Sequence, residues 1–138
     1  MKQIIVLAAL LSAAGCAASA DNEARLRADS DARLATELRN YSQAGAPVSC
    51  VSLRNLGGNR SAGEGAIIFG GNGSRVYVNR PPAGCPALDS GRALQVRTSA
   101  SQLCRGEIVT VFDPVSGNQS GSCGLGDFTP YERRRAEG

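Results

Sequence analysis

The sequence predicts a mainly β fold, in which a small antiparallel sheet curls into a barrel or a sandwich and one helix lies at the N-terminus. Three observations lead to this prediction. About six short stretches between residues 47 and 131 are rich in β-branched and aromatic residues, glycine-rich turns separate them, and no helical pattern lies between them. A region of this size buries a limited core, so we expect residues 47–131 to form a β domain held together by disulfides.

Residues 1–20 have the layout of a secretory signal peptide. Lys2 precedes an apolar stretch, residues 4–11, and small residues follow. The stretch is too short to span a bilayer. Two processing sites compete: an A-x-A site would release a soluble periplasmic chain beginning at Asp21, whereas the residues before Cys16 resemble a bacterial lipobox. We favour lipidation of Cys16, because its removal leaves an even number of cysteines in the domain.

The four other cysteines, Cys50, Cys85, Cys104 and Cys123, fit an oxidising compartment. Four cysteines permit three pairings, and we predict Cys85 with Cys104 and Cys50 with Cys123. The first bond would tie a proline-rich loop to the strongest strand, and the second would join the first and last strands. A zinc site is the competing use, but the chain has no C-x-x-C pair and no histidine. We therefore expect no metal and no other cofactor.

Residues 21–46 predict a helical tether. Residues 21–41 are rich in Ala, Arg, Leu and Glu, lack Gly and Pro, and place Leu26, Leu34 and Leu38 roughly on one side. This apolar stripe is thin, so the helix is marginal by itself. Two interpretations stay open: a docking helix or stalk that lifts the domain off a membrane, and a partly ordered tether.

The predicted strands are short and bounded by turn residues. The strongest, residues 107–112, is a run of β-branched and aromatic residues that ends at the turn Asp113-Pro114. Neither of its faces is strongly polar, so we expect it to be central and covered on both sides. The clearest hairpin joins two apolar runs through the glycine-rich residues 70–74. In chain order the strands are residues 48–53, 66–69, 75–79, 93–98, 107–112 and 122–126, and residues 128–131 close the domain.

Glycine-rich loops also bind phosphate groups in nucleotide-binding proteins. The sequence has two glycine-rich segments, the polar connection at residues 57–65 and the turn at residues 70–74. Neither has the Gly-Lys-Ser/Thr ending of a P-loop or the GxGxxG spacing, and no strong helix follows either one. Turn chemistry is sufficient to explain these glycines.

The charge pattern argues against nucleic acid as a partner. The formal net charge is +3, and every basic residue after Lys2 is an arginine. Residues 132–138 form a basic tail, in which three consecutive arginines stand beside glutamates. We expect this tail to be a frayed, solvated end rather than an anchor for acidic lipid.

The absence of histidine narrows the enzyme classes. It excludes a Ser-His-Asp triad, a Cys-His pair and a histidine general base. A glycosidase would need two carboxylates, and nothing in the spacing of the acids selects a pair, so they are interpreted as solvated turn residues. The acids of the β domain are Glu64, Asp89, Glu107, Asp113 and Asp127.

Three blocks carry a resemblance to a known family: Cys-Pro at residues 85–86, Leu-Cys-Arg-Gly-Glu at residues 103–107 and Cys-Gly-Leu-Gly-Asp-Phe at residues 123–128. Together with the signal and its lipobox-like cysteine, the chain resembles short proteobacterial exported proteins and lipoproteins that share a domain of unknown function. The resemblance covers residues 48–131. It implies the periplasmic side of a Gram-negative envelope, with Ala17 after Cys16 resembling outer-membrane sorting, and it implies no activity.

Two functions are compared. We favour a non-enzymatic β domain that is tethered in the cell envelope by a lipid anchor and binds a protein or glycan partner. The alternative is a weak cell-wall glycan hydrolase that uses a carboxylate pair. The candidate binding residues are Arg80, Arg105, Tyr77 and Tyr131, each of which is equally well explained as a solvated arginine or a rim aromatic.

Overall fold

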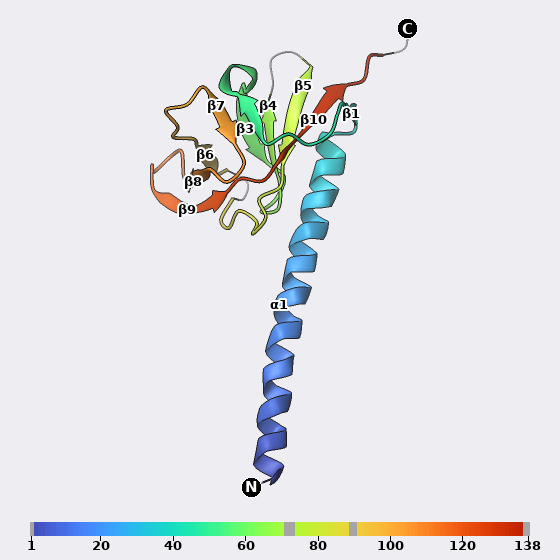
Figure 1. Ribbon diagram of the computed structural model, residues 1–138, viewed down its shortest axis with the longest axis vertical. Helices are drawn as coiled ribbons and strands as arrows, with labels where there is room; N and C mark the ends of the chain where they lie inside the picture. The colour runs from blue at the N-terminus through green and yellow to red at the C-terminus, as the bar shows by residue number, and fades with distance from the viewer. Residues whose placement is uncertain (1, 71–73, 89–90, 137–138) are drawn as a thin grey trace.

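The computed structural model describes residues 2–70, 74–88 and 91–136, with side chains from residue 17 onward. The described residues form one long helix, one short 3-10 helix and ten strands (Figure 1). In chain order these are α1 (Lys2–Glu37), β1 (Tyr41–Gln43), β2 (Cys50–Ser52), η1 (Leu53–Asn55), β3 (Gly58–Ser61), β4 (Ile67–Gly70), β5 (Arg75–Asn79), β6 (Ala93–Gln95), β7 (Gln102–Cys104), β8 (Ile108–Phe112), β9 (Gln119–Gly124) and β10 (Phe128–Arg133).

The strands form three antiparallel sheets. The largest has five strands in the order β1-β10-β5-β4-β3, a second has the order β6-β8-β9, and the third is the pair β2-β7. This confirms the prediction of a mainly β, antiparallel fold with one N-terminal helix. The arrangement is sandwich-like, and within the described residues the strands do not close into a barrel.

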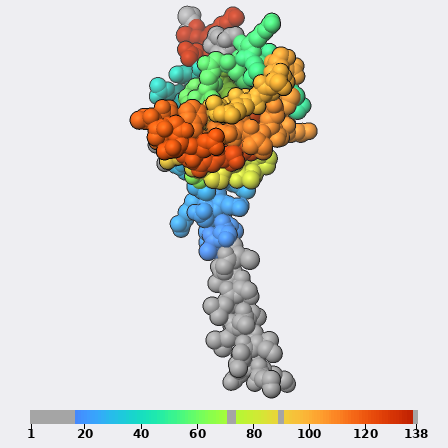
Figure 2. All heavy atoms as spheres, turned by 90° about the vertical axis from the view of Figure 1, so that its left-hand side faces the viewer, coloured from blue at the N-terminus to red at the C-terminus, as the bar shows by residue number. Residues whose placement is uncertain are grey.

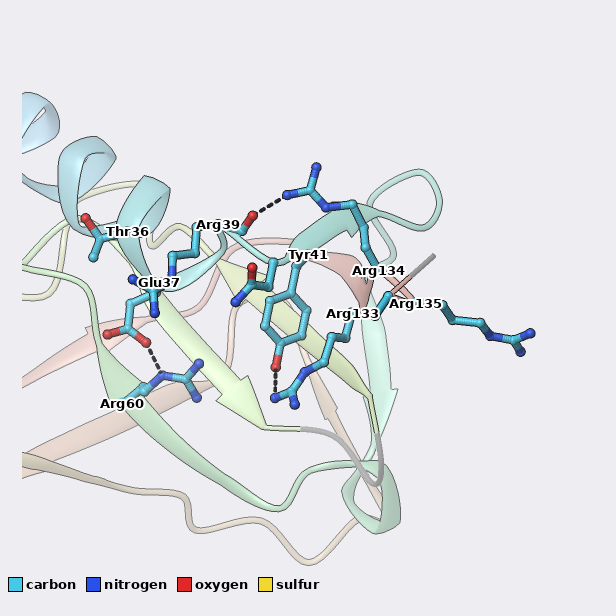
Figure 3. Close-up of a pocket in the computed structure, with 10 residues that line it drawn as sticks. Thr36, Glu37, Arg39, Tyr41, Arg60, Arg133, Arg134 and Arg135 are labelled. Carbon is cyan, nitrogen blue, oxygen red and sulfur yellow. Dashed lines mark hydrogen bonds and ion pairs between the residues drawn. The ribbon is translucent and has the colours of Figure 1, made fainter. Parts of the chain in front are cut away.

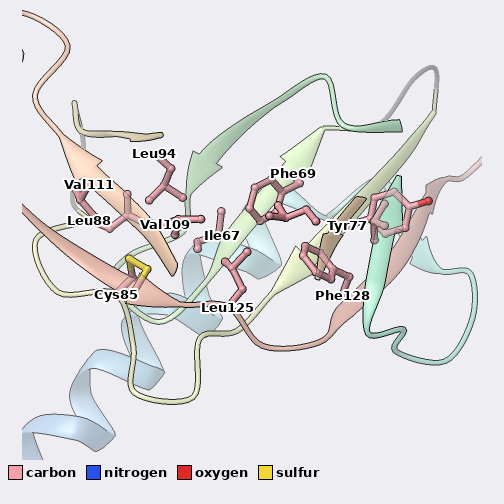
Figure 4. Packing of buried hydrophobic residues seen from close by; sticks show 13 residues of the cluster. Ile67, Phe69, Tyr77, Cys85, Leu88, Leu94, Val109, Val111, Leu125 and Phe128 are labelled. Carbon is pink, nitrogen blue, oxygen red and sulfur yellow. A yellow bond between two sulfur atoms is a disulfide. The ribbon is translucent and has the colours of Figure 1, made fainter. Parts of the chain in front are cut away.

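The main hydrophobic core lies between the five-stranded sheet and the two smaller sheets (Figure 4). The rings of Phe69 on β4 and Phe128 on β10 pack with their centroids 5.7 Å apart. The three-stranded sheet contributes Leu94, Val109 and Val111 to the same core. Because side chains alternate along a strand, each of these sheets turns every second residue inward.

One buried polar side chain joins this core to the loop before β10. Asn79, at the end of β5, is fully buried. Its Nδ2 donates to the carbonyl oxygen of Gly126 at 2.7 Å, and the Gly126 N–H donates to Asn79 Oδ1 at 2.9 Å. The Asn79 amide therefore takes the place of a backbone partner for the buried Gly126. It satisfies both the N–H and the carbonyl oxygen of that glycine.

The second face of the five-stranded sheet is covered by α1 (Figure 1). Leu34 is buried against Ile68, Val76 and Val78, and Leu38 packs beside them. The central strands β4 and β5 are therefore buried on both faces. The helix is integrated into the fold here, which favours the docking interpretation over a loose tether.

A close contact between the helix and a glycine loop fixes this docking. Ser30 of α1 is fully buried, and its Oγ accepts the N–H of Gly65 at 2.9 Å. A Cβ placed on Gly65 would lie 2.7 Å from Ser30 Oγ, and Gly63 has a positive φ of 72°. The glycines are thus required where the loop approaches the helix and turns.

The boundaries of the helix differ from the prediction. The helix ends at Glu37, and Tyr41–Gln43 form β1, so the predicted tether of residues 21–46 extends too far. Within the described residues, no helix combines the length and apolar character needed to cross a membrane. The side chain of Cys16 lies outside those described, so its lipidation stays a prediction.

All four cysteines of the domain are in disulfides, as predicted, but the predicted pairing is wrong. Cys50 and Cys104 are directly opposite in the β2-β7 pair, with their Cα atoms 4.0 Å apart. Cys123 points inward from β9 and bonds Cys85 of the proline-rich loop, with the Cα atoms 5.0 Å apart. We call the exposed Cys50–Cys104 bond the surface disulfide and the buried Cys85–Cys123 bond the core disulfide. Two disulfides indicate an oxidising, exported environment.

The strand predictions are confirmed in part. The hairpin of β4 and β5 is present, and β8 lies in the middle of its sheet. The expectation that β8 is covered on both faces is wrong, because Ile108 is 65% exposed while Val109 and Val111 are buried. β3, which the sequence left as a polar connection, is a strand at the edge of the five-stranded sheet.

Candidate functional site

The four residues predicted to bind a partner do not form one site. Arg80 pairs with Asp31 of α1 at 2.7 Å, and Arg105 pairs with Asp127 at 3.4 Å. Both arginines line one shallow hollow of about 430 Å³. Each is already held by a carboxylate of this chain, which weakens the case for either as a free anion contact.

The two tyrosines have structural positions. Tyr77 is 7% exposed and belongs to the main core, which leaves little of its side chain for contact with a partner. Its position follows from the alternation along β5, which turns it toward Phe69 and Phe128. Tyr131 lies half-buried on the opposite face and packs against the cluster beneath α1.

The described acids of the β domain are engaged in local contacts. Glu64 accepts the N–H of Ala87 at 3.2 Å, and Glu107 accepts the N–H of Cys104. Asp127 forms the ion pair with Arg105. These contacts hold turns and loops in place, and they do not present two carboxylates facing each other for a hydrolase. Asp89 lies outside the described residues.

Asp113 has the same kind of local role. Its Oδ1 accepts the N–H groups of Val115 and Ser116, at 2.8 and 3.2 Å. These hydrogen bonds favour the ionised carboxylate and lower the pKa of Asp113. A carboxyl that stays ionised in this way is unsuited to act as a general acid at neutral pH.

A different site stands out in the structure, at the C-terminal end of α1. A hollow of about 680 Å³ opens there between the helix end and the rim of the five-stranded sheet (Figure 3). We call it the arginine hollow. It is lined by Thr36, Glu37, Arg39, Asn40, Tyr41, Arg60, Arg133, Arg134, Arg135 and Ala136.

The chain builds this hollow by pairing its first and last strands. β1 pairs with β10 so that Tyr41 lies opposite Arg133, and the Arg134 N–H then donates to the carbonyl oxygen of Asn40 at 2.8 Å. On the same face, β3 presents Arg60, which is opposite Ile68 of β4. The predicted frayed tail is therefore wrong for Glu132 and Arg133, which belong to β10.

The charge of the hollow is strongly positive. Five guanidinium groups line it, and Glu37 is its single carboxylate among the described residues, which leaves four positive charges uncompensated. The whole chain has a formal net charge of only +3. Positive charge is therefore concentrated at this place rather than spread evenly over the surface.

The arginines differ in what holds them. Arg60 pairs with Glu37 at 2.9 Å. Arg133 donates to the Tyr41 hydroxyl at 3.0 Å, and its guanidinium carbon lies 5.4 Å from the Tyr41 ring centroid, within the range of a cation–π contact. Arg134 donates to the carbonyl oxygen of Arg39. Two guanidinium groups are thus positioned by neutral acceptors, which leave their charge uncancelled.

The other two arginines are less constrained. The guanidinium groups of Arg39 and Arg135 make no hydrogen bond or ion pair with the described residues. Figure 3 shows Arg135 pointing away from the Tyr41 ring, while the guanidinium of Arg60 lies near its own partner Glu37. The hollow thus combines guanidinium groups that are held by described residues with others that are not.

This chemistry is suited to binding anions. Arginine presents a planar fork of N–H donors that matches carboxylate and phosphate oxygens, and it does not give up its proton at neutral pH. The run of three arginines is the sequence signal that points to this site. The position of these arginines beside Tyr41, however, depends on the pairing of two strands that are about 90 residues apart in the sequence.

A second hollow lies between α1 and the proline-rich loop. It measures about 440 Å³ and is lined by Leu26 of the helix, residues 80–86 of the loop and several charged side chains. Its charges are of both signs, with Glu23 and Glu64 beside Arg27 and Arg80. It therefore selects no particular kind of ligand.

Two further findings bear on the site. Within the residues whose side chains are described, no group of three or more His, Cys, Asp or Glu side chains is placed to hold a metal ion. No protein-family model matches the sequence, and no curated protein or solved structure is significantly similar to it.

Proposed function

We propose that the protein is an exported, non-enzymatic binding domain of the cell envelope, and that its arginine hollow binds an anionic protein or glycan. The observation that carries this proposal is the placement of Arg133 and Arg134, whose guanidinium groups are held by a phenol and a carbonyl. The family resemblance of the sequence is consistent with such a location and adds no activity.

Neighbouring cations that lack a carboxylate repel one another, because like charges at short range are unfavourable. A purely structural arginine is usually paired, as Arg75 is with Glu132 at 2.5 Å on the other face of β10. Among the described residues, the hollow instead has four more guanidinium groups than carboxylates. An anionic partner would remove this repulsion, so binding and local stability are coupled.

Preorganisation strengthens the argument. A side chain that is already held loses less conformational freedom when it binds, and this loss costs about 0.5–1.5 kcal/mol for each long side chain. The contacts of Arg133 with Tyr41 reduce that cost before any ligand arrives. Each arginine has several N–H donors, so these contacts leave further donors for a ligand.

The docked helix also sets the orientation of the arginine hollow relative to the N-terminal end of the chain. In Figure 2 the first part of the helix whose side chains are described, drawn in blue, emerges below the domain, and the C-terminal segment, drawn in dark red, lies at the opposite end. The helix from Ala17 to Glu37 extends over about 30 Å. If Cys16 carries a lipid anchor, α1 acts as a stalk, and the arginine hollow faces away from the membrane that holds the chain.

The proposal is tested by salt elution from a polyanionic column such as heparin-agarose. A variant with Arg60→Gln, Arg133→Gln and Arg135→Gln is compared with a control that carries Arg27→Gln, Arg92→Gln and Arg97→Gln outside the hollow. Both variants lose the same charge. We expect the hollow variant to elute at clearly lower salt than the wild type and the control to elute near it, because the hollow concentrates the field.

Equal shifts of both variants would show that net charge alone governs retention, and would contradict a specific site. The location is tested separately, by the intact mass of the protein from membrane and soluble fractions. A lipid-modified N-terminus at Cys16 is the expected result, and a soluble chain that begins at Asp21 would refute the stalk.

A further inference from the structure

We infer that the anionic group recognised by the arginine hollow is a phosphomonoester carried on a larger polar body. This inference rests on the proposed function and specifies its ligand chemistry. It draws on three features of the hollow: the number and origin of its guanidinium groups, its size, and the absence of histidine from its lining.

The guanidinium groups enter from separate parts of the fold. Arg39 follows α1, Arg60 stands on β3, and Arg133 ends β10. A carboxylate has two coplanar oxygens, which a single arginine fork can satisfy. A phosphomonoester has three strong acceptor oxygens that point in different directions and carries a charge of about −1.5 to −2 at pH 7. Several arginines from different elements therefore match a phosphomonoester better than a carboxylate.

The size of the hollow indicates that the phosphate belongs to a larger molecule. About 680 Å³ lies in the range of sites that hold small organic ligands. Asn40 lines the hollow beside the arginines, and its side-chain amide offers both donors and an acceptor for hydroxyl groups. A sugar phosphate or a lipid headgroup with a terminal phosphate has this combination of a charged end and a polar body.

The lining makes the inference testable by pH. Among the described residues, the titratable and charged groups that face the hollow are Glu37 and Arg39 at or just after the end of α1, Tyr41 on β1, Arg60 on β3, and Arg133, Arg134 and Arg135 at or just after the end of β10. The chain contains no histidine, the side-chain type whose charge ordinarily changes between pH 5 and 8. A change of affinity in this window therefore reports the ligand.

A phosphomonoester loses its second proton near pH 6, so its dianion is depleted about tenfold between pH 7.5 and pH 5. We expect its affinity to weaken by about that factor over this range. Carboxylates, sulfates and phosphodiesters keep their charge there, so their binding should be flat. The slope of the pH profile thus separates the anion classes.

The experiment has a soluble arm and a membrane arm, both with the full-length chain at low ionic strength. In the soluble arm, calorimetry compares glucose 6-phosphate with glucuronate and glucose 6-sulfate, which share the sugar and differ in the anion. In the membrane arm, phosphatidylcholine vesicles contain either phosphatidic acid, a phosphomonoester, or phosphatidylglycerol, a phosphodiester. Binding in one arm alone identifies whether the phosphate comes from a soluble molecule or a lipid headgroup.

Variants link the binding to the hollow. Arg133→Gln should weaken phosphomonoester binding tenfold or more, because charge-assisted hydrogen bonds are lost. Arg39→Gln is the second variant, since the guanidinium of Arg39 forms no hydrogen bond or ion pair with the described residues and its loss should leave the fold intact. Arg97→Gln, an exposed arginine outside the hollow, is the matched control and should bind like the wild type.

The outcomes separate this inference from the proposed function. If phosphate and carboxylate bind equally and independently of pH, and this binding depends on Arg133, the inference of a phosphomonoester ligand is refuted. The proposal that the arginine hollow binds anions is then still supported. If no anion binds in either arm and the column test shows no specific effect, both proposals fail. Preferential phosphomonoester binding with the expected pH slope, lost in Arg133→Gln and Arg39→Gln, supports both.

Discussion

Asn79 offers the sharpest test of how this fold is held together. It is fully buried, and its amide forms a reciprocal pair of hydrogen bonds with the backbone of Gly126 at 2.7 and 2.9 Å. Asn79→Ala removes both bonds and leaves the buried N–H and carbonyl of Gly126 without their partner. Each such loss costs about 1–3 kcal/mol, so the free energy of unfolding should fall by about 2–6 kcal/mol.

A second substitution tests the identity of the amide. Asn79→Asp keeps an acceptor for the Gly126 N–H but places a carboxylate against the Gly126 carbonyl. Burial and this repulsion should raise the pKa of the new carboxyl above its unfolded value. The folded state then binds a proton more tightly than the unfolded state, so the stability of Asn79→Asp rises as the pH falls through that pKa.

Urea unfolding followed by tyrosine fluorescence measures both variants, since the chain has three tyrosines and no tryptophan. Each variant is compared with the wild type at the same pH, which cancels the other titrating groups. Asn59→Ala, at an exposed position on β3, is the control and should change stability by less than about 0.5 kcal/mol. Losses below about 1 kcal/mol for Asn79→Ala, or a pH-independent loss for Asn79→Asp, would refute the reasoning.

Three further predictions follow from the described contacts. Mild reduction followed by alkylation and mass spectrometry should open the surface disulfide before the core disulfide, because only the former is accessible to solvent; simultaneous opening would contradict this. Asp113→Ala should lower the melting temperature at pH 7 but not near pH 2. The pKa of Asp113 is lowered in the folded state, so its stabilisation is present above the unfolded-state pKa and is lost as the pH falls through the folded-state pKa. An equal decrease in melting temperature at both pH values would indicate that Asp113 stabilises the fold by packing instead. Gly65→Ala should lower the stability by about 1–3 kcal/mol, because its Cβ would meet Ser30 of the helix at 2.7 Å. Gly45→Ala, whose Cβ has ordinary contacts, is the control, and equal hydrogen exchange of α1 in both variants would contradict the docking role.

The strands with a clear local pattern could be predicted from the sequence. The β4-β5 hairpin and β8 consist of β-branched and aromatic residues between turn residues, and they form where expected. β3 could not be found in this way, because Gly-Asn-Arg-Ser has no apolar alternation. It forms because β4 offers a free edge, and an edge strand exposed to solvent needs few apolar side chains.

The errors concern contacts between distant parts of the chain. The disulfide pairing depends on the register of β2 and β7, which puts Cys50 opposite Cys104, and no local signal carries that register. Similarly, Tyr41 lies in a segment with helical composition but pairs with Arg133. The arginine hollow arises from this pairing, so it could not be located before the order of the strands was known.

The position of β10 has a consequence for the order in which the molecule can assemble. β10 is the last of the described strands in sequence, yet it is an interior strand of the five-stranded sheet, between β1 and β5. Until residues 128–133 are available, β1 has no neighbour and the sheet is divided into two parts. If the chain is threaded through a membrane from its N-terminus, the five-stranded sheet therefore cannot be completed until residues 128–133 have passed.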